Sequence, residues 1–512
     1  MTAKIPRFAR VPESSSEAAF LLLEVLTALL IAALALAVLI RSTRESNAAL
    51  HTALMSEDAA VRARSRLTAV EHGGLVPGQR QGDDGGGFTW VTKIVSLATT
   101  AVLNGRGGIV HIDSVTIALV LAISLLGLVM VTSASVSIAS KESGETFYYL
   151  ERQLLLMLMG GASAALIFCI PTQALERLAM PLLITALLLL FLVLIPGLGH
   201  SVNGSRRWLR IATMNFQVSE LARVLVLIYI ASYAARKEEE LRGTFMGLAK
   251  PLGLLCCAGG LLLIEPDFGA ASVLFVTGFG VLFIGGARLR YVIAMTLFAA
   301  AGFGGLAMSS GYRVRRLKAF LDPWADPYNT GFQLTQSLIA IGRGQWFGVG
   351  LGESVQKLFY LPEAHTDFLF AVLAEELGLA GVLLTLALFI ALIWRSFYIA
   401  RLASDGGLKF QAYLAAGFGL WLGIQAFINI GVNMGVLPTK GLTLPLMSYG
   451  RSSLIVSLAW VGLLLRVYHE AMLEKRGSAT VRQRSSVLGD RQARSRTPVQ
   501  RELLDDEEGD PA

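Results

Sequence analysis

The sequence predicts an all-α integral membrane protein, a polytopic bundle of ten transmembrane helices with an additional helix near the N-terminus. Its 512 residues are 54% hydrophobic and only 16% charged, whereas about a quarter of a soluble domain is charged. So few polar residues cannot cover a water-facing surface, which excludes an ordinary soluble enzyme. The 52 glycines and 25 phenylalanines are typical of closely packed transmembrane helices.

Ten apolar segments follow one another between Asp113 and Arg466, each close to the ~20 residues that cross a bilayer. We expect them near 113–134, 153–171, 177–197, 220–235, 247–264, 268–286, 291–309, 367–394, 411–434 and 451–467. Three loops are larger than the others, namely 198–219, 310–366 and 435–450. They follow the third, seventh and ninth segments, so the alternation of the chain across the membrane places all three on one side.

Both ends of the chain extend beyond the ten-helix core, which we place at 113–470. Residues 1–112 hold an apolar run at 18–40, too long for a signal-peptide core, and a polar, Gly-rich linker. If this run spans the membrane, the N-terminus lies outside; an added anchor, a fused segment and a mis-set start codon are the alternatives. Within the linker we expect residues 88–103 to form an interfacial amphipathic helix. The tail 471–512 lacks an apolar face, so we expect it to be disordered and cytoplasmic.

Signatures of soluble-enzyme chemistry are absent from the sequence. There is no P-loop, no paired Cys or His spacing for a metal, no Gly-x-Ser-x-Gly motif and no dinucleotide fingerprint. The three cysteines, Cys169, Cys256 and Cys257, lie in apolar segments, which excludes a disulfide scaffold. Any chemistry must therefore come from the polar residues of the three large loops and of the adjoining helix ends.

The first polar cluster lies in loop 198–219, which carries Arg206, Arg207 and Arg210 and no acidic residue. Arginine binds phosphate oxygens with two parallel hydrogen bonds, which favours an anion site. Arginine next to tryptophan is equally common as a membrane-interface anchor, so both interpretations stay open. Glu220 and Arg223 follow at the start of a helix, three residues apart, and share a face. They form either a structural ion pair or an intramembrane functional pair.

The second cluster closes the long loop 310–366, where Lys357 is followed by Glu363, His365 and Asp367. An aspartate at a helix N-terminus is favoured by the helix dipole, so Asp367 could be only a cap. A cap does not explain the neighbouring glutamate and histidine. A partly desolvated carboxylate has a raised pKa and can act as a general base, which is the functional interpretation of Asp367.

The third cluster is in loop 435–450 and the helix start that follows it. It contains Lys440, Arg451 and the small hydroxyl residues Ser448, Ser452 and Ser453. Non-helical backbone at membrane depth is tolerated where it lines a cavity, and an arginine at a helix start favours an anion site. The alternative is a re-entrant loop with structural serines.

At these clusters the chain resembles the SEDS family (shape, elongation, division and sporulation), over about 113–470. The resemblance is carried by Asn203–Trp208, Phe216–Glu220, Gln356–Lys357 with Tyr360–Phe368, and Pro445–Ser453. The Gln356–Lys357 and Lys440–Pro445 segments are similar to the FtsW branch of that family. Two features depart from the family pattern: the extra helix at 18–40, and Arg451, where many relatives carry glycine.

The resemblance implies a peptidoglycan glycosyltransferase that polymerises lipid II into β-1,4 glycan strands at the division septum and releases undecaprenyl diphosphate. It places the protein in the bacterial cytoplasmic (inner) membrane with its active site on the periplasmic side. The partners it implies are an undecaprenyl-linked glycan, an FtsI-type class B penicillin-binding transpeptidase and other membrane proteins of the divisome, with no nucleic acid. It also implies a supporting divalent cation, Mg²⁺ or Mn²⁺, whose ligands are unknown, and no organic cofactor.

The resemblance and the charge pattern together assign candidate roles. Asp367 is the catalytic residue, supported by Glu363 and His365. The expected ligands of the substrate diphosphate are Arg206, Arg207, Lys357, Lys440 and Arg451. The expected lining of a polar cavity is Glu220, Arg223, Ser448, Ser452 and Ser453. A lipid II flippase, which makes no bond, is the alternative function, and a purely scaffolding division protein is a third.

Overall fold

The computed structural model describes residues 78–83, 89–94, 110–142, 144–202, 205–211, 214–288 and 318–495, with isolated positions between 290 and 315. Contacts divide the chain into two units, Met1–Ile109 and Val110–Ala512. In the first, strands β1 (Gly78–Asp83) and β2 (Thr89–Ile94) form an antiparallel pair. The expected amphipathic helix at 88–103 is therefore wrong in its first half, because β2 consists mostly of β-branched and aromatic residues that favour a strand. The helix predicted at 18–40 lies outside the described residues.

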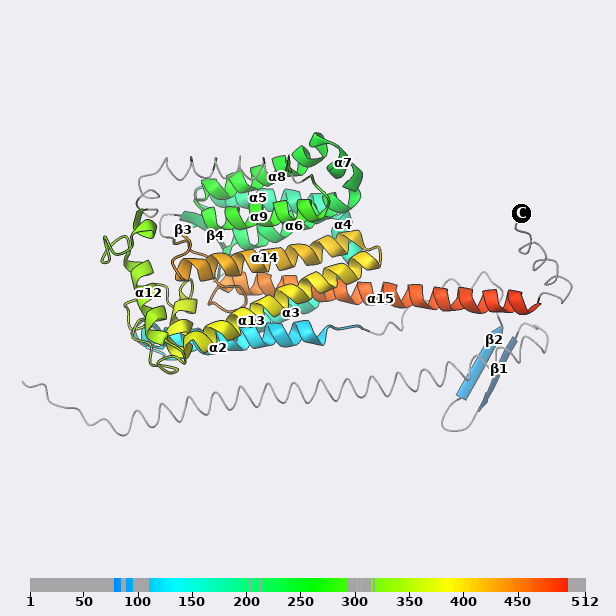
Figure 1. Cartoon of the computed structure of the whole chain (residues 1–512), viewed down its shortest axis with the longest axis horizontal. Helices are drawn as coiled ribbons and strands as arrows, with labels where there is room; N and C mark the ends of the chain where they lie inside the picture. The colour runs from blue at the N-terminus through cyan, green and yellow to red at the C-terminus, as the bar shows by residue number, and fades with distance from the viewer. Residues whose placement is uncertain are drawn as a thin grey trace, which may run out of the picture. The chain divides into compact units, whose positions relative to one another are not determined.

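The second unit is a helix bundle (Figure 1). Its described helices are α2 (Ser114–Glu142), α3 (Tyr148–Cys169), α4 (Thr172–Arg177), α5 (Ala179–Leu194), α6 (Val218–Arg236), α7 (Glu238–Gly243), α8 (Phe245–Ile264), α9 (Phe268–Ile284), α12 (Phe332–Gly344), α13 (Leu369–Asp405), α14 (Lys409–Asn433) and α15 (Arg451–Ser495).

Most of these helices have the length and composition of membrane spans. In the described part of the chain, seven are long and apolar enough to cross a bilayer, and α5 and α9 are shorter apolar helices. Together they coincide with nine of the ten predicted segments, whereas the predicted seventh, near 291–309, lies almost entirely outside the described residues. The chain is thus a multi-pass membrane protein. Helix α15 continues to Ser495, past the end predicted near 467, because residues 471–495 contain no proline and many good helix formers.

Close helix packing in the bundle depends on glycine where α3 meets α15. A Cβ atom added to Gly462 would lie 2.3 Å from the carbonyl oxygen of Ala164, and one added to Gly160 would lie 2.4 Å from a methyl of Leu458. Any larger residue would push the two helices apart. Small residues at such crossings are typical of transmembrane helix pairs.

The large loops are at one end of the bundle, where Figure 1 labels α12, β3 and β4, while α4 and α7 lie at the other end. Loop 198–219 forms a three-stranded antiparallel sheet that the sequence did not predict. Its strands are β3 (Gly199–Val202), β4 (Ser205–Ile211) and β5 (Met214–Gln217), in that order. Trp208 of β4 pairs with Gln217 of β5, so the sheet leads directly into α6.

Helix α13 is broken at Gly378, whose φ of 64° is left-handed. The break leaves carbonyl and amide groups without partners inside the helix, and the loop after α12 supplies them. The backbone N–H groups of Val349 and Gly350 donate to the carbonyl oxygens of Glu375 and Glu376, at 3.0 and 3.2 Å. On the other side of the break, the N–H groups of residues 379 and 380 donate to carbonyl oxygens of residues 345 and 346. The first part of α13, which begins just after Asp367, is therefore fixed to the long loop.

Candidate functional site

Asp367 lies two residues before α13, and helix α14 holds its backbone. The side-chain amides of Asn429 and Asn433 donate to the carbonyl oxygen of Asp367, at 2.9 and 3.0 Å. Asn429 also donates to the carbonyl oxygen of Leu442, at 2.6 Å. One asparagine thus joins the long loop to loop 435–450, and the backbone of Asp367 is fixed while its side chain is left for other contacts.

The carboxylate of Asp367 lies against the third large loop and is partly withdrawn from water. A Cβ added to Gly441 would lie 3.2 Å from its Oδ2 atom. Burial, and next the negative charge of Glu363, raise the pKa of Asp367 to about 7, while Arg207 lowers it. Within the described residues, no hydrogen bond to the carboxylate oxygens of Asp367 contributes to this pKa shift. Asp367 therefore has the exposure and the pKa of a general base that works near neutral pH.

The two residues expected to support Asp367 shape the turn before it. Glu363 has a left-handed φ of 57°, and its side chain accepts a hydrogen bond from the Thr366 hydroxyl at 2.8 Å. The ring of His365 packs against Tyr149 of α3, with 4.6 Å between centroids, and against Tyr449, at 5.7 Å. The carbonyl oxygen of His365 accepts from the N–H of Tyr449, at 3.1 Å. Glu363 thus acts on the charge of Asp367, whereas His365 fastens the turn to neighbouring segments.

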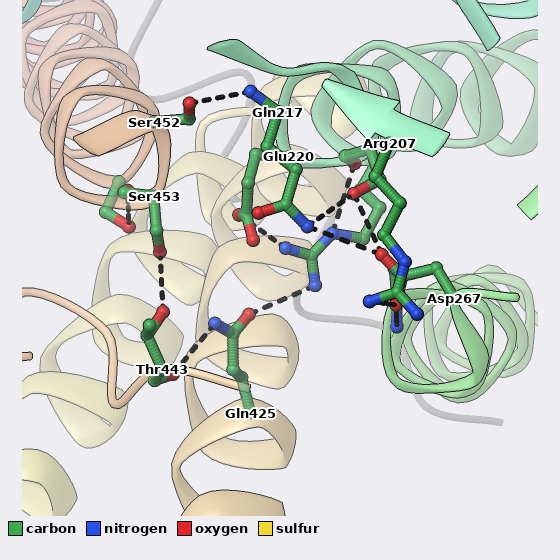
Figure 2. Close-up of polar contacts among 12 residues, drawn as sticks. Arg207, Gln217, Glu220, Asp267, Gln425, Thr443, Ser452 and Ser453 are labelled. Atoms are coloured by element: carbon green, nitrogen blue, oxygen red, sulfur yellow. Dashed lines mark hydrogen bonds and ion pairs between the residues drawn. The ribbon is translucent and has the colours of Figure 1, made fainter. Parts of the chain in front are cut away.

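Arg207 brings the first loop into the site by binding the turn between α8 and α9. Its guanidinium donates to the carbonyl oxygens of Glu265 and Pro266, at 3.3 and 2.5 Å, and lies 3.9 Å from Oδ1 of Asp267. Asp267 is itself the N-cap of α9 and accepts from the N–H of Ala270 at 3.0 Å. Figure 2 shows Arg207 against Asp267. The turn therefore orients the arginine whose charge acts on Asp367.

The other expected diphosphate ligands are placed differently. Lys440 is partly buried beside Asp267; burial lowers the pKa of Lys440 and Asp267 raises it. Arg206 is exposed on β4, and since neighbouring strand residues point to opposite faces, it does not share the contacts of Arg207. Arg451 is partly exposed in the first turn of α15, where a cation is disfavoured by the helix dipole unless an anion is near.

Lys357 lies in a different environment from the one expected. It is buried, and its Nζ atom lies 3.0 Å from Oε1 of Glu376 and 3.1 Å from the hydroxyl of Ser133. The same hydroxyl donates to the Glu376 carboxylate at 2.8 Å. This buried ion pair joins the long loop to α2 and α13. The structure therefore does not bring Lys357 together with Arg207 and Lys440.

Glu220 and Arg223 form a buried ion pair on α6. The Arg223 guanidinium also donates to Oε1 of Gln425 on α14, at 3.2 Å, and Gln425 in turn donates to the carbonyl oxygen of Thr443, at 3.1 Å. Figure 2 shows this connection from α6 through Gln425 to the third loop. The pair has a structural role, since it links two helices to loop 435–450.

The three expected cavity serines hold backbone and hydroxyl groups in place. Ser448 accepts from the N–H of Leu444 at 3.1 Å, and Ser452 from the N–H of Gln217 at 2.8 Å. Ser453 accepts from the Thr443 hydroxyl at 3.1 Å. Ser452 and Ser453 thereby attach the start of α15 to β5 and to the third loop (Figure 2).

Two groups of site residues were missed in the sequence. The Glu265–Asp267 turn lies outside the three polar clusters singled out in the sequence. Gln425, Asn429 and Asn433 were not singled out, although they recur every four residues in an apolar helix and so lie on one face. That amide stripe was the available signal for the contact with Asp367.

The described residues do not bring together a set of side-chain ligands for the divalent cation that the resemblance implied. Among the described residues, no group of three or more His, Cys, Asp or Glu side chains could hold a metal ion. Asp267 is engaged as a helix cap and with Arg207.

Comparison with known proteins identifies the family. The family model for FtsW, RodA and SpoVE, described as a cell cycle protein, matches residues 113–473. A protein of Thioalkalivibrio sulfidiphilus named probable peptidoglycan glycosyltransferase FtsW is 55% identical over 353 residues, which cover 69% of this chain and 88% of the relative. A protein of the same name from Nitrosococcus halophilus is 54% identical over 356 residues, with coverage of 69% and 92%.

Solved structures give the same result for the fold. A chain from work on the structural coordination of polymerization and crosslinking by a peptidoglycan synthase complex superposes with a TM-score of 0.57 at 34% identity, covering 70% of this chain and 98% of that one. The rod shape determining protein RodA of Thermus thermophilus gives a TM-score of 0.52 at 32% identity, with coverage of 70% and 96%. The chain therefore belongs to the FtsW/RodA/SpoVE family of cell cycle proteins.

Proposed function

We propose that this protein is a peptidoglycan glycosyltransferase that polymerises lipid II into β-1,4 glycan strands. The observation that carries the proposal is the state of Asp367: its backbone is fixed by two asparagines, and the pKa of its carboxyl is raised to about 7. Arg207 acts on the charge of Asp367, and Lys440 shares the Asp267 carboxylate with Arg207. The name of these relatives, probable peptidoglycan glycosyltransferase FtsW, supports the same activity.

Asp367 acts as the general base. The GlcNAc 4-hydroxyl of the acceptor lipid II attacks the anomeric carbon of the donor MurNAc while Asp367 takes the hydroxyl proton. The new bond joins that oxygen to the anomeric carbon, and the bond from this carbon to the diphosphate oxygen breaks. A single displacement converts the α-linkage to a β-linkage. General base catalysis of this kind contributes roughly 10²–10⁴ in rate.

The leaving group is undecaprenyl diphosphate, and its charge must be stabilised as the bond breaks. Arg207 supplies positive charge next to Asp367, Lys440 supplies it at Asp267, and Arg451 adds a cation at the start of α15. Arginine is suited to the task because its planar fork binds phosphate oxygens with two hydrogen bonds. Arg207 is held in place by the Glu265–Asp267 turn, so its orientation is set before substrate arrives.

The location and partners follow from the same proposal. The active site lies on the periplasmic side of the cytoplasmic membrane, at the division septum, and an FtsI-type class B penicillin-binding transpeptidase crosslinks the product. In support, one structurally similar chain comes from work on a peptidoglycan synthase complex. Other membrane proteins of the divisome are expected to assemble with the pair.

The test is polymerisation of lipid II by the purified protein in detergent, where there are no two sides between which a lipid could be moved. We expect glycan strands of many disaccharides on a gel. A lipid II flippase is the second candidate function. Absence of glycan in detergent, together with movement of lipid II across vesicle membranes, would support the flippase and contradict the glycosyltransferase.

A further inference from the structure

Glu265 differs from the other carboxyl groups near the site because it is fully buried and has no partner. Its exposed fraction is 0%, and neither carboxyl oxygen has a hydrogen-bond partner among the described residues. Nearly all buried polar groups are hydrogen-bonded, and an ionised carboxylate without hydrogen bonds is strongly disfavoured in such a place. The side chain is therefore held as the neutral acid.

The neighbouring charges agree with a neutral Glu265. Burial, and next the Asp267 carboxylate, raise the pKa of Glu265 to about 8, while Arg207 acts in the opposite direction. Arg207 donates to the backbone oxygen of Glu265 and not to its carboxyl group. The arginine thus fixes the turn without forming an ion pair with the glutamate.

Charged groups from three segments meet at this turn. Arg207 comes from β4, Asp267 from the turn itself, and Lys440 from loop 435–450, where Asp267 acts on its charge. Asp367 lies beyond Arg207. With Glu265 neutral, the turn sets one carboxylate, that of Asp267, against the two positive charges of Arg207 and Lys440, and Asp367 acts on Arg207 from its other side. Ionised Glu265 would add one more negative charge next to Arg207 and Asp267, and the attraction of the group for an anion would fall.

We propose that Glu265 sets the charge of this basic group: as a neutral acid it leaves Arg207 and Lys440 able to bind the diphosphate of a lipid-linked substrate, and its ionisation abolishes that binding. The inference rests on the proposed function, because the diphosphate belongs to the proposed donor. Glu265 is a positioning residue that acts through Arg207 and Lys440 and does not itself contact the reacting atoms.

The experiment measures binding of undecaprenyl diphosphate to the purified full-length protein from pH 7 to pH 9. For wild type we expect the affinity to fall about tenfold, since the neutral fraction of a group with a pKa near 8 falls by that factor. Glu265→Gln, which is neutral at every pH, should keep its pH 7 affinity at pH 9. Glu265→Met should do the same, which guards against a folding defect in one variant.

Two controls identify the titrating group. Glu353→Gln, which removes an exposed acid of the long loop, should follow wild type. Lys440→Arg, which cannot lose its charge in this range, should also keep the tenfold fall. A loss of affinity in Glu265→Gln and Glu265→Met equal to that of wild type would overturn the proposal, as would an equal fall for uncharged undecaprenol.

Lipid II polymerisation measured in parallel separates this inference from the proposed function. If wild type binds the diphosphate with the expected pH dependence but makes no glycan, the glycosyltransferase is contradicted and the role of Glu265 is supported. If glycan is made and Glu265→Gln loses affinity as wild type does, only the role of Glu265 is contradicted.

Discussion

Single residues of the site are tuned by what surrounds their carboxyl groups. Asp367 and Glu265 both have raised pKa values, about 7 and about 8, and burial is the main cause of each. The two residues act in opposite protonation states: Asp367 acts as the ionised base, whereas Glu265 acts as the neutral acid. Activity should therefore rise with pH through about 7 and fall again above about 8, the bell shape of an essential base and an essential acid.

The acidic side of that profile gives a prediction for Glu363. Below pH 7 the rate should fall about tenfold per pH unit, because protonated Asp367 cannot accept a proton. Glu363→Gln removes the negative charge that raises the pKa of Asp367, so the acidic midpoint should move to lower pH. The measurement is kcat/KM for lipid II against pH. Glu353→Gln is the matched control and should leave the midpoint unchanged; an unmoved midpoint in Glu363→Gln would contradict the assignment of Asp367 as the titrating base.

At the scale of elements, the break in α13 positions the catalytic turn. The loop after α12 provides hydrogen bonds on both sides of Gly378, and Glu375 and Glu376 add side-chain contacts to the same loop. Glu375 accepts from the Ser354 hydroxyl and from Arg343, at 2.5 and 2.9 Å. The segment that starts after Asp367 is therefore held by the long loop as well as by α14.

Gly378 is required at this break, and its substitution should destabilise the protein. A Cβ atom at this position would lie 2.3 Å from the N atom of Gly348. The substituted residue would also have to adopt a left-handed φ of 64°. We expect Gly378→Ala to lower the free energy of unfolding by at least the ~1–3 kcal/mol of such backbone strain, seen as a lower melting temperature in detergent. Gly342→Ala in α12, where a Cβ meets no atom within 4 Å, should be neutral or stabilising. Equal melting temperatures for the two variants would contradict this role of the break.

Substitutions of the Lys357–Glu376 ion pair distinguish a structural role of Lys357 from a role in binding the substrate diphosphate. Lys357→Met leaves a buried carboxylate unpaired, which typically costs about 3–5 kcal/mol of stability. Adding Glu376→Gln removes that charge and should restore most of the stability and of the affinity for undecaprenyl diphosphate. Thermal unfolding and diphosphate binding are measured on both variants. A double variant that is stable yet does not bind would instead make Lys357 a ligand of the diphosphate.

The sequence predicts the helices of this protein but not the tertiary contacts between them. Long apolar segments mark the helices because the membrane requires them, and nine of ten coincide with described helices. The break at Gly378 could not be predicted, because the hydrogen-bond partners of the residues around it lie 26 to 34 residues earlier, in the loop after α12. The pairing of Lys357 with Glu376 and the sheet β3–β5 are likewise tertiary. Asp367 could be singled out by type and position, whereas its link to Asn429 and Asn433 needed the fold.

Across the helix bundle, charged side chains gather at the ends, and the helix faces between them are mostly apolar. The lipid-facing sides of α3 and α13 expose residues such as Leu158 and Ile390. One end carries Arg207, Lys440 and Asp367. Away from these loops, Arg395 binds the Asp113 carboxylate through two nitrogens, at 2.8 and 2.7 Å, and so joins α13 to the start of α2. A lipid-linked sugar suits this arrangement, with its tail in the membrane and its diphosphate at the basic end.

Lipid II polymerisation by Asp367→Asn tests most directly whether Asp367 is the general base that the surrounding loops and helices position. The variant keeps the backbone contacts with α14, so it should insert and melt like wild type. We expect its glycan synthesis to fall by roughly 10²–10⁴, the worth of a general base. Glycan synthesis at the wild-type rate by a folded Asp367→Asn protein would contradict the account.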